Sequence, residues 1–195
     1  TTIALKKTLK KFEYVASSED SSLIFITGEI GSGKSTLLQL LKYQTENTHA
    51  TFLLQRPFTD MQCYKEYLCN IANTPYISND DETILLETLA TTIQSPIVLF
   101  IDAFELMSYQ QIQLTLKLAN LPMISVVCAI RSSEAEKLFN DIRLNIKNKI
   151  YFTCNPLTTD EIAQYISFLL NYMNETSHTK LFPKKVFSDL YRYTC

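Results

Sequence analysis

Residues 28–35 carry residue types that can bind phosphate. Their sequence, GEIGSGKS, fits the pattern GxxxxGK[ST] at every fixed position. In such a loop, residues without a Cβ let successive backbone N–H groups point inward around a phosphate, and the start of the following helix adds its positive dipole end. The chain has only three glycines, and all three, Gly28, Gly31 and Gly33, lie in this segment. The pattern therefore predicts a phosphate-binding loop for a nucleotide.

Individual side chains have expected contacts with ATP or ADP and with Mg²⁺. Lys34 would reach the β- and γ-phosphates, and the hydroxyl of Ser35 would hold Mg²⁺. Asp102 ends an apolar run, PIVLFI, and would anchor the same Mg²⁺ from a neighbouring strand. The alternative role for Asp102 is a helix N-cap at the strand exit. The residues expected to contact the nucleotide are Gly28, Glu29, Ile30, Gly31, Ser32, Gly33, Lys34, Ser35 and Thr36.

Strands and helices must alternate around these residues to position them. Short apolar, β-rich runs predict strands at residues 22–27, 50–55, 96–102, 123–130 and 149–154. Helical patterns lie between them, at residues 36–43, 60–72, 81–94 and 109–120. Alternation of this kind builds a parallel sheet covered by helices on both faces. The expected fold class is therefore α/β, a three-layer sandwich with a central parallel sheet.

The chain changes character after residue 155. Residues 155–157 are typical of a turn, and Thr158 with Glu161 forms a capping-box pattern that begins a helix. We therefore expect a core domain over residues 1–155, with a leading helix and linker in residues 1–20, and the beginning of a helical lid over residues 156–195. Because the chain starts without Met and stops within an expected helix, we interpret it as a fragment.

The amino-acid composition argues against several other classes of protein. A chain of 195 residues that is 46% hydrophobic and 19% charged can form one folded domain with a small appendage. With 18 basic and 20 acidic residues, it lacks the positive charge of a protein that mainly coats nucleic acid. No apolar run is long enough to span a membrane. The five cysteines lack CxxC spacing, which favours free thiols in a reduced cytoplasm.

Over nearly its whole length, the sequence resembles an AAA+ ATPase of the ExeA type, a family associated with bacterial general secretion and pilus assembly. The resemblance rests on the expected helix at 1–14 and on the segments ITGEIGSGKSTLL, FTDMQCYKEYLCNIA, IVLFIDAFE, VVCAIRSSEAEKLF and NPLTTDEIAQYISFLL. It implies a P-loop NTPase fold and Mg-ATP hydrolysis that serves a secretion, pilus or cell-envelope complex. It also implies a homo-oligomer when full length, a membrane-complex protein partner, and a cytoplasmic location with a tether to the inner membrane outside this chain.

The sequence departs from that family at the catalytic positions. The family places a water-orienting glutamate directly after the Walker B aspartate, which corresponds to Asp102 here, but position 103 is Ala. Glu105 is the nearest substitute, and it either takes the catalytic role or is a surface charge. The sensor residue would be one of Arg131, Ser132 and Ser133, and Arg143 and Lys147 match the arginine finger by position only. These departures predict nucleotide binding with slow hydrolysis.

Two further functions stay open. The first is a DNA-associated ATPase of the transposon-targeting or origin-loading type, for which the slightly acidic charge balance makes nucleic acid the less favoured partner. The second is a nucleotide-sensing scaffold with little hydrolysis, which Ala103 favours.

Overall fold

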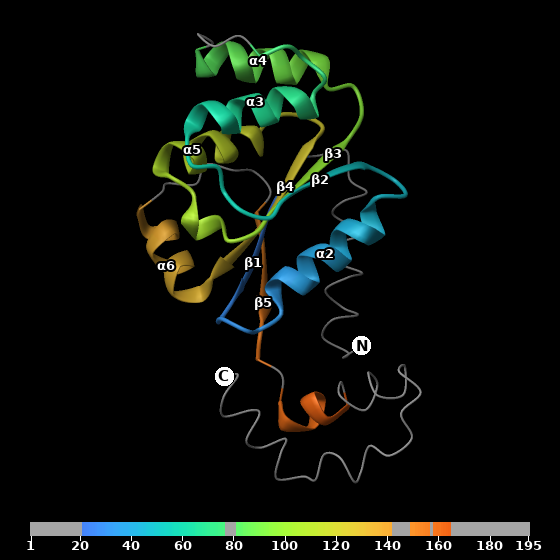
Figure 1. Ribbon diagram of the computed structural model, residues 1–195, viewed down its shortest axis with the longest axis vertical. Coiled ribbons are helices and arrows are strands. Elements are labelled where there is room, and N and C mark those ends of the chain that lie inside the picture. The colour runs from blue at the N-terminus through green and yellow to red at the C-terminus, as the bar shows by residue number, and fades with distance from the viewer. Residues whose placement is uncertain (1–20, 77–80, 142–148, 157, 165–195) are drawn as a thin grey trace.

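A computed structural model describes residues 21–76, 81–141, 149–156 and 158–164 (Figure 1). Its centre is a sheet of five strands: β1 (Leu23–Gly28), β2 (Ala50–Leu54), β3 (Ile97–Ile101), β4 (Ile124–Arg131) and β5 (Lys149–Cys154). Their order across the sheet is β2-β3-β4-β1-β5, and all neighbouring pairs are parallel. The predicted α/β fold with a central parallel sheet is confirmed.

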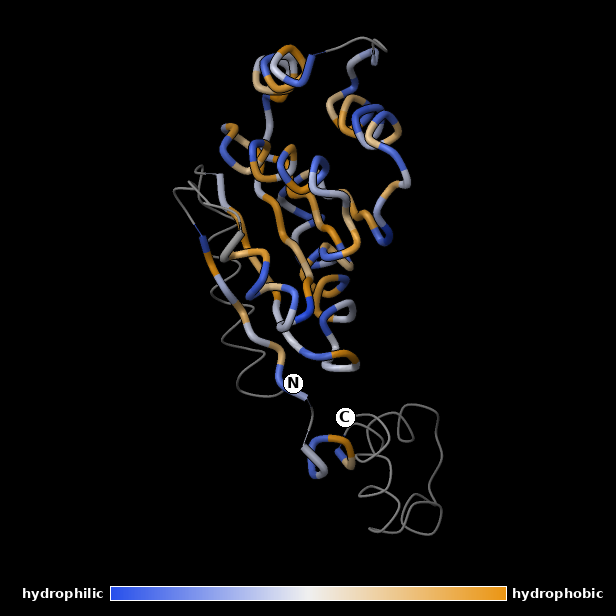
Figure 2. The backbone as a smooth tube through the Cα atoms, turned by 90° about the vertical axis from the view of Figure 1, so that its left-hand side faces the viewer, coloured by the Kyte–Doolittle hydropathy of each residue, from blue (hydrophilic) through white to orange (hydrophobic). Residues whose placement is uncertain are grey.

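The central strands are buried on both faces, which explains their nearly continuous apolar sequences. Side chains alternate between the two faces, as strand geometry requires. In β1, Leu23 and Phe25 belong to the core cluster on one face, whereas Ile24 and Ile26 belong to the cluster on the other. Figure 2 shows the resulting apolar strands, in orange, at the centre of the molecule.

Among the described residues, five α-helices cover these faces. Helix α2 (Lys34–Thr45) packs on one face through Leu37, Leu38 and Leu41. The other face carries α3 (Met61–Ile71), α4 (Glu82–Thr92), α5 (Tyr109–Leu118) and α6 (Ser132–Asp141). Figure 1 shows α2 on one side of the strands and α5 and α6 on the other. The predicted three layers are therefore present.

Capping side chains set two of the helix boundaries. Asp60 Oδ1 accepts from the backbone N–H of Cys63 at 2.7 Å, and Asp81 Oδ1 accepts from that of Thr83 at 3.3 Å. Short acidic side chains satisfy the free N–H groups of a first helical turn, which favours them just before a helix. As a result, α3 and α4 begin one residue later than the predicted helices at 60–72 and 81–94.

Two predicted parts of the chain fall largely outside the described residues: the leading helix and linker at 1–20, and lid residues 157 and 165–195. Where the predicted lid begins, Thr158 and Glu161 do form a capping box. The backbone N–H of Thr158 donates to Glu161 Oε2 at 2.9 Å, that of Glu161 donates to Thr158 Oγ1 at 3.3 Å, and a helix follows over residues 159–164. The domain boundary after residue 155 stays a prediction.

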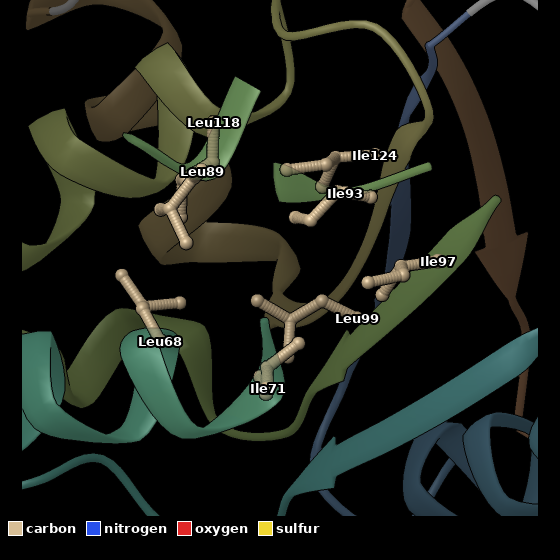
Figure 3. A pocket seen from close by; sticks show the side chains of 8 residues that line it. All are labelled: Leu68, Ile71, Leu89, Ile93, Ile97, Leu99, Leu118 and Ile124. Carbon is tan, nitrogen blue, oxygen red and sulfur yellow. The ribbon is translucent and has the colours of Figure 1, made fainter. Parts of the chain in front are cut away.

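A small void lies between the sheet and helices α3, α4 and α5 (Figure 3). Only leucine and isoleucine side chains line it: Leu68, Ile71, Leu89, Ile93, Ile97, Leu99, Leu118 and Ile124. Its volume of about 10 Å³ is near the minimum for one water molecule, which would find no polar partner there. We therefore do not regard it as a ligand site.

No helix in the described part of the chain has the length and apolar character needed to cross a bilayer.

Candidate nucleotide-binding site

The predicted phosphate-binding segment folds as a loop that joins the end of β1 to the start of α2 (Figure 1). Gly31 (φ 81°) and Gly33 (φ 86°) adopt left-handed backbone conformations, which glycine reaches without steric strain. Gly28 is needed for a different reason. A Cβ at this position would lie 2.5 Å from the carbonyl oxygen of Cys154 and 2.5 Å from Oγ of Ser32. The three glycines therefore permit one tight loop against the end of β5.

The amino end of α2 has no side-chain cap. The first hydrogen bond of the helix joins the N–H of Leu37 to the carbonyl of Gly33 at 2.9 Å, so the N–H groups of residues 34–36 are not used within the helix. No side chain caps Gly33, and the first turn contains no acidic residue. Such a helix start attracts anions through its free N–H groups and its dipole. The exposed residues of the segment are Glu29, Ile30, Gly31, Gly33, Ser35 and Thr36.

Lys34 adds a positive charge to the loop. Its Nζ donates to the carbonyl of Gly28 at 2.9 Å and to that of Glu29 at 2.7 Å. Burial raises the pKa of the Cys154 thiol, and the positive charge of Lys34 acts in the opposite direction. In the same loop, Ser32 Oγ is buried without a hydrogen-bond partner among the described residues. An ammonium group, free N–H groups and an unpaired hydroxyl in one loop fit a phosphate group.

Asp102 follows β3 at the edge of the sheet that carries the loop. Its N–H donates to the carbonyl of Leu54 at 2.9 Å, and its Oδ1 accepts from the N–H of Ala103 at 2.9 Å. Strand β4 lies between β3 and β1, so Asp102 and the loop belong to strands that are not neighbours. The N-cap of α5 is Ser108, whose side chain accepts from the N–H of Gln111. The alternative role of Asp102, as the cap of the following α-helix, is therefore wrong.

Glu105 lies in a short helical turn that follows β3. Ala103 has a left-handed backbone (φ 50°, ψ 46°), and the 3-10 turn η1 (Phe104–Leu106) follows it. This turn brings Glu105 to the end of β4, where its Oε1 accepts from Arg131 Nε at 2.7 Å. Only 9% of the Glu105 side chain is exposed, and its Oε2 is buried with no hydrogen-bond partner in the described part of the chain. Glu105 is therefore not a surface charge.

Arg131 lies beside the phosphate loop, because it ends β4 and is the register partner of Gly28 on β1. The hydrogen bond and the negative charge of Glu105 raise the pKa of its guanidinium. The other sensor candidates, Ser132 and Ser133, begin α6. Sequence reasoning missed the ion pair because Glu105 and Arg131 are 26 residues apart. The sequence does contain one indication that the two side chains lie close together. Both residues follow predicted apolar strands, and the carboxyl ends of parallel strands share one edge of the sheet.

The remaining predicted contacts concern Mg²⁺ and a neighbouring subunit. Within the described ranges, no group of three or more His, Cys, Asp and Glu side chains could hold a metal ion. Mg²⁺ is usually bound by one or two carboxylates together with substrate phosphates, which suits Ser35 and Asp102. Arg143 and Lys147, the arginine-finger candidates, lie outside the described residues.

Many solved structures share this fold, among them the following three. The Aeropyrum pernix ORC1 protein in complex with DNA has a TM-score of 0.66 and 10% identity, over 87% of this chain and 48% of that chain. The Cdc6 protein from Pyrobaculum aerophilum has a TM-score of 0.63 and 14% identity, over 83% of this chain and 48% of that chain. Drosophila ORC bound to AT-rich DNA and Cdc6 has a TM-score of 0.61 and 12% identity, over 85% of this chain and 67% of that chain. This chain thus spans about half the length of the Aeropyrum and Pyrobaculum proteins.

No curated protein sequence matches the chain. A family model described as "AAA domain" matches residues 17–139, which is well over half of the chain and includes the phosphate loop, Asp102 and Arg131. Together with the parallel sheet and the phosphate loop, this match shows that the chain belongs to the AAA domain family of P-loop ATPases.

Proposed function

We propose that this chain binds Mg-ATP and hydrolyses it slowly, and that it thereby drives or regulates the assembly of a bacterial secretion, pilus or cell-envelope complex. The uncapped start of α2 is the observation that carries nucleotide binding. Its unused N–H groups, the Lys34 ammonium and the unpaired Ser32 hydroxyl supply the donors that a polyphosphate needs. The resemblance to ExeA-type proteins supports the cellular role.

Each predicted site residue has a separate role in this function. Lys34 neutralises the β- and γ-phosphate oxygens, and Ser35 and Asp102 hold Mg²⁺, which supplies charge neutralisation when bound. Glu105 positions the attacking water, a role that its buried and unpaired Oε2 supports. Because Ala103 occupies the family's glutamate position and Glu105 already shares its charge with an arginine, we expect slow turnover.

Replacing Lys34 tests nucleotide binding directly. Lys34→Ala should weaken Mg-ATP affinity by about tenfold or more, because it removes the cation that neutralises the phosphate oxygens. Calorimetric titration measures the affinity, and circular dichroism checks that the domain stays folded. Lys42→Ala is the matched control, since Lys42 lies on the same helix and pairs with Glu46 at its other end. Equal affinities for wild type and Lys34→Ala would rule out the proposed loop function.

A second cellular role, as a DNA-associated ATPase of the transposon-targeting or origin-loading type, has support from the fold. The Aeropyrum and Drosophila structures named above contain DNA. The net charge of −2 supports the secretion role instead. Titration of fluorescent duplex DNA with the chain, with and without Mg-ATP, separates the two roles. Saturable binding that weakens steeply with salt would favour the DNA role, and its absence would favour the secretion role.

Nucleotide binding without measurable phosphate release would favour a nucleotide-sensing scaffold.

A further inference from the structure

The carboxyl end of β5 places a free thiol against the phosphate loop. Cys154 is the last residue of β5 and the register partner of Gly28 on β1. Its Cβ and its carbonyl oxygen lie 3.1 Å and 2.5 Å from the point that a Cβ on Gly28 would occupy. Figure 1 shows the loop between β1 and α2 beside this end of β5. Cys154 therefore borders the loop without belonging to the phosphate-binding pattern.

A buried hydroxyl faces the same point. Ser32 Oγ lies 2.5 Å from the position of a Gly28 Cβ, and Ser32 is 9% exposed. This oxygen has no hydrogen-bond partner among the described residues. Buried polar groups nearly always have a partner, so an unpaired one indicates a group that binds there. A hydroxyl can donate to a phosphate, to a thiolate or to an oxygen of a molecule attached to Cys154, and these groups would therefore compete for Ser32.

The thiol of Cys154 is accessible, and the charge of the loop acts on it. Cys154 is partly exposed, whereas Cys69 and Cys128 are buried. Burial raises the pKa of the Cys154 thiol, and the positive charge of Lys34 lowers it. Because the thiolate is the nucleophile, the raised pKa makes exchange with a disulfide slow at neutral pH. Cys154 is therefore suited to regulation over minutes to hours and not to catalysis.

We propose that Cys154 is a modification site at which an anionic low-molecular-weight disulfide, such as glutathione disulfide, prevents nucleotide binding. The inference rests on the proposed function. The Cys154 thiolate attacks one sulfur of the disulfide, whose S–S bond breaks, and the other half leaves as a thiolate that takes up a proton. The new S–S bond attaches a glutathionyl group beside the loop. Because even one carbon atom added to Gly28 would clash there, the attached group must cover or displace the loop, which excludes the phosphates.

Protection of the thiol by nucleotide is the first test. The chain is incubated with glutathione disulfide, with and without a non-hydrolysable ATP analogue and Mg²⁺, and mass spectrometry of proteolytic peptides follows the mixed disulfide at each cysteine. With the analogue at about ten times its Kd, the rate at Cys154 should fall about tenfold, because only the nucleotide-free fraction reacts. Cys63, exposed on α3, is the internal control, and its rate should not change. Equal rates at Cys154 in both conditions, or reaction of Cys63 with none at Cys154, would overturn the proposal.

The affinity of the modified protein is the second test. Once Cys154 is fully modified, calorimetry should show an affinity for the analogue that is lower by about tenfold or more, because coupling between two sites is reciprocal. Dithiothreitol should restore the original affinity. Cys154→Ser should bind the analogue equally well before and after the same treatment, and Cys154→Ala replaces it if that variant does not fold. Unchanged affinity of the modified wild type, or a loss that circular dichroism shows to be unfolding, would refute the modification site.

Failure of the modification site is separable from failure of nucleotide binding itself. If the untreated wild type does not bind the analogue, or if Lys34→Ala binds it as tightly as the wild type, the proposed function is wrong and the modification site falls with it. If the untreated protein binds the analogue in a Lys34-dependent way but protection or loss of affinity is not seen, only the modification site is wrong.

Discussion

Two carboxylates follow β3 and reach different surroundings. Asp102 is partly buried, and its Oδ1 accepts from the N–H of Ala103, whereas Glu105 is nine-tenths buried and pairs with Arg131. The left-handed backbone of Ala103 causes this difference, because it turns the chain into η1 and aims residue 105 at the end of β4. A non-glycine residue in that conformation costs about 1–2 kcal/mol. Burial of Phe104 and the hydrogen bond to Asp102 offset this strain.

The position of Asp102 predicts an effect specific to the metal. Asp102→Asn should leave nucleotide affinity in EDTA nearly unchanged and should remove most of the affinity gained with Mg²⁺, because hard cations prefer carboxylate oxygens. The amide oxygen of Asn can still accept from the N–H of Ala103, so the turn should stay folded. Titrations of both proteins with ATP, in EDTA and in Mg²⁺, measure the difference. An unchanged Mg²⁺ dependence in the variant would place the acidic ligand elsewhere.

The site residues differ in how far the sequence alone shows their roles. Lys34, Ser35 and the glycines belong to one contiguous pattern whose chemistry is local, so their places in the loop could be predicted. Glu105 and Arg131 could be named as candidates, but their pairing depends on an unexpected turn after β3 and on the position of β4 beside β3. Neither feature is a property of local sequence.

At the level of elements, the strands were easier to predict than the connections between them. All five predicted strands lie within one residue of the observed bounds at each end, because buried parallel strands are short apolar runs bounded by polar residues. The turn η1 was missed, since three residues with a left-handed start leave no periodic signal. The capping box of Ser108 and Gln111 at the start of α5 was missed although its S-x-x-Q pattern is present.

Gln111 ties α5 to the loop after β2, and its loss should destabilise the domain. The residue is 1% exposed. Its Oε1 accepts from the N–H of Ser108 at 2.9 Å, and its Nε2 donates to the carbonyls of Phe58 at 2.9 Å and Asp60 at 3.2 Å. Gln111→Leu should lower the free energy of unfolding by about 2–4 kcal/mol, because three backbone groups lose their partner. Urea denaturation measures the change. Gln110→Leu, exposed on the same helix, should alter it by less than about 0.5 kcal/mol, and equal effects of the two variants would contradict this role.

In the whole molecule, the sheet order assembles the site from distant parts of the chain. Strand β1 lies between β4 and β5, so Arg131 and Cys154 flank Gly28 in register. Strand β3 lies beside β4, which brings the turn with Glu105 to Arg131. Alternating strands and helices predict a parallel sheet with its site at the carboxyl edge, but they do not show which strands are neighbours. For this reason the site residues were predictable singly and their arrangement was not.

At the scale of an assembly, we predict that the catalytic site is shared between subunits, as the family resemblance implies. Among the described residues, Lys34 and Arg131 are the cations that approach the end of β1, and Arg131 is paired with Glu105. A further cation for the transition state is therefore expected from Arg143 of a neighbouring subunit. Loss of such an arginine lowers turnover by about a thousandfold or more.

Mixing two inactive variants tests this arrangement. Lys34→Ala has a defective nucleotide site but keeps Arg143, whereas Arg143→Ala keeps the nucleotide site but lacks the arginine, so each should be inactive alone. Their equimolar mixture should regain phosphate release, because an intact loop then meets an intact arginine from the neighbour. Lys34→Ala mixed with Glu105→Gln is the matched control and should stay inactive, since both defects affect the same half of the site. Activity per subunit of the wild type should also rise with protein concentration. A rate that does not depend on concentration, with no recovery in the first mixture, would show that each subunit carries a complete site.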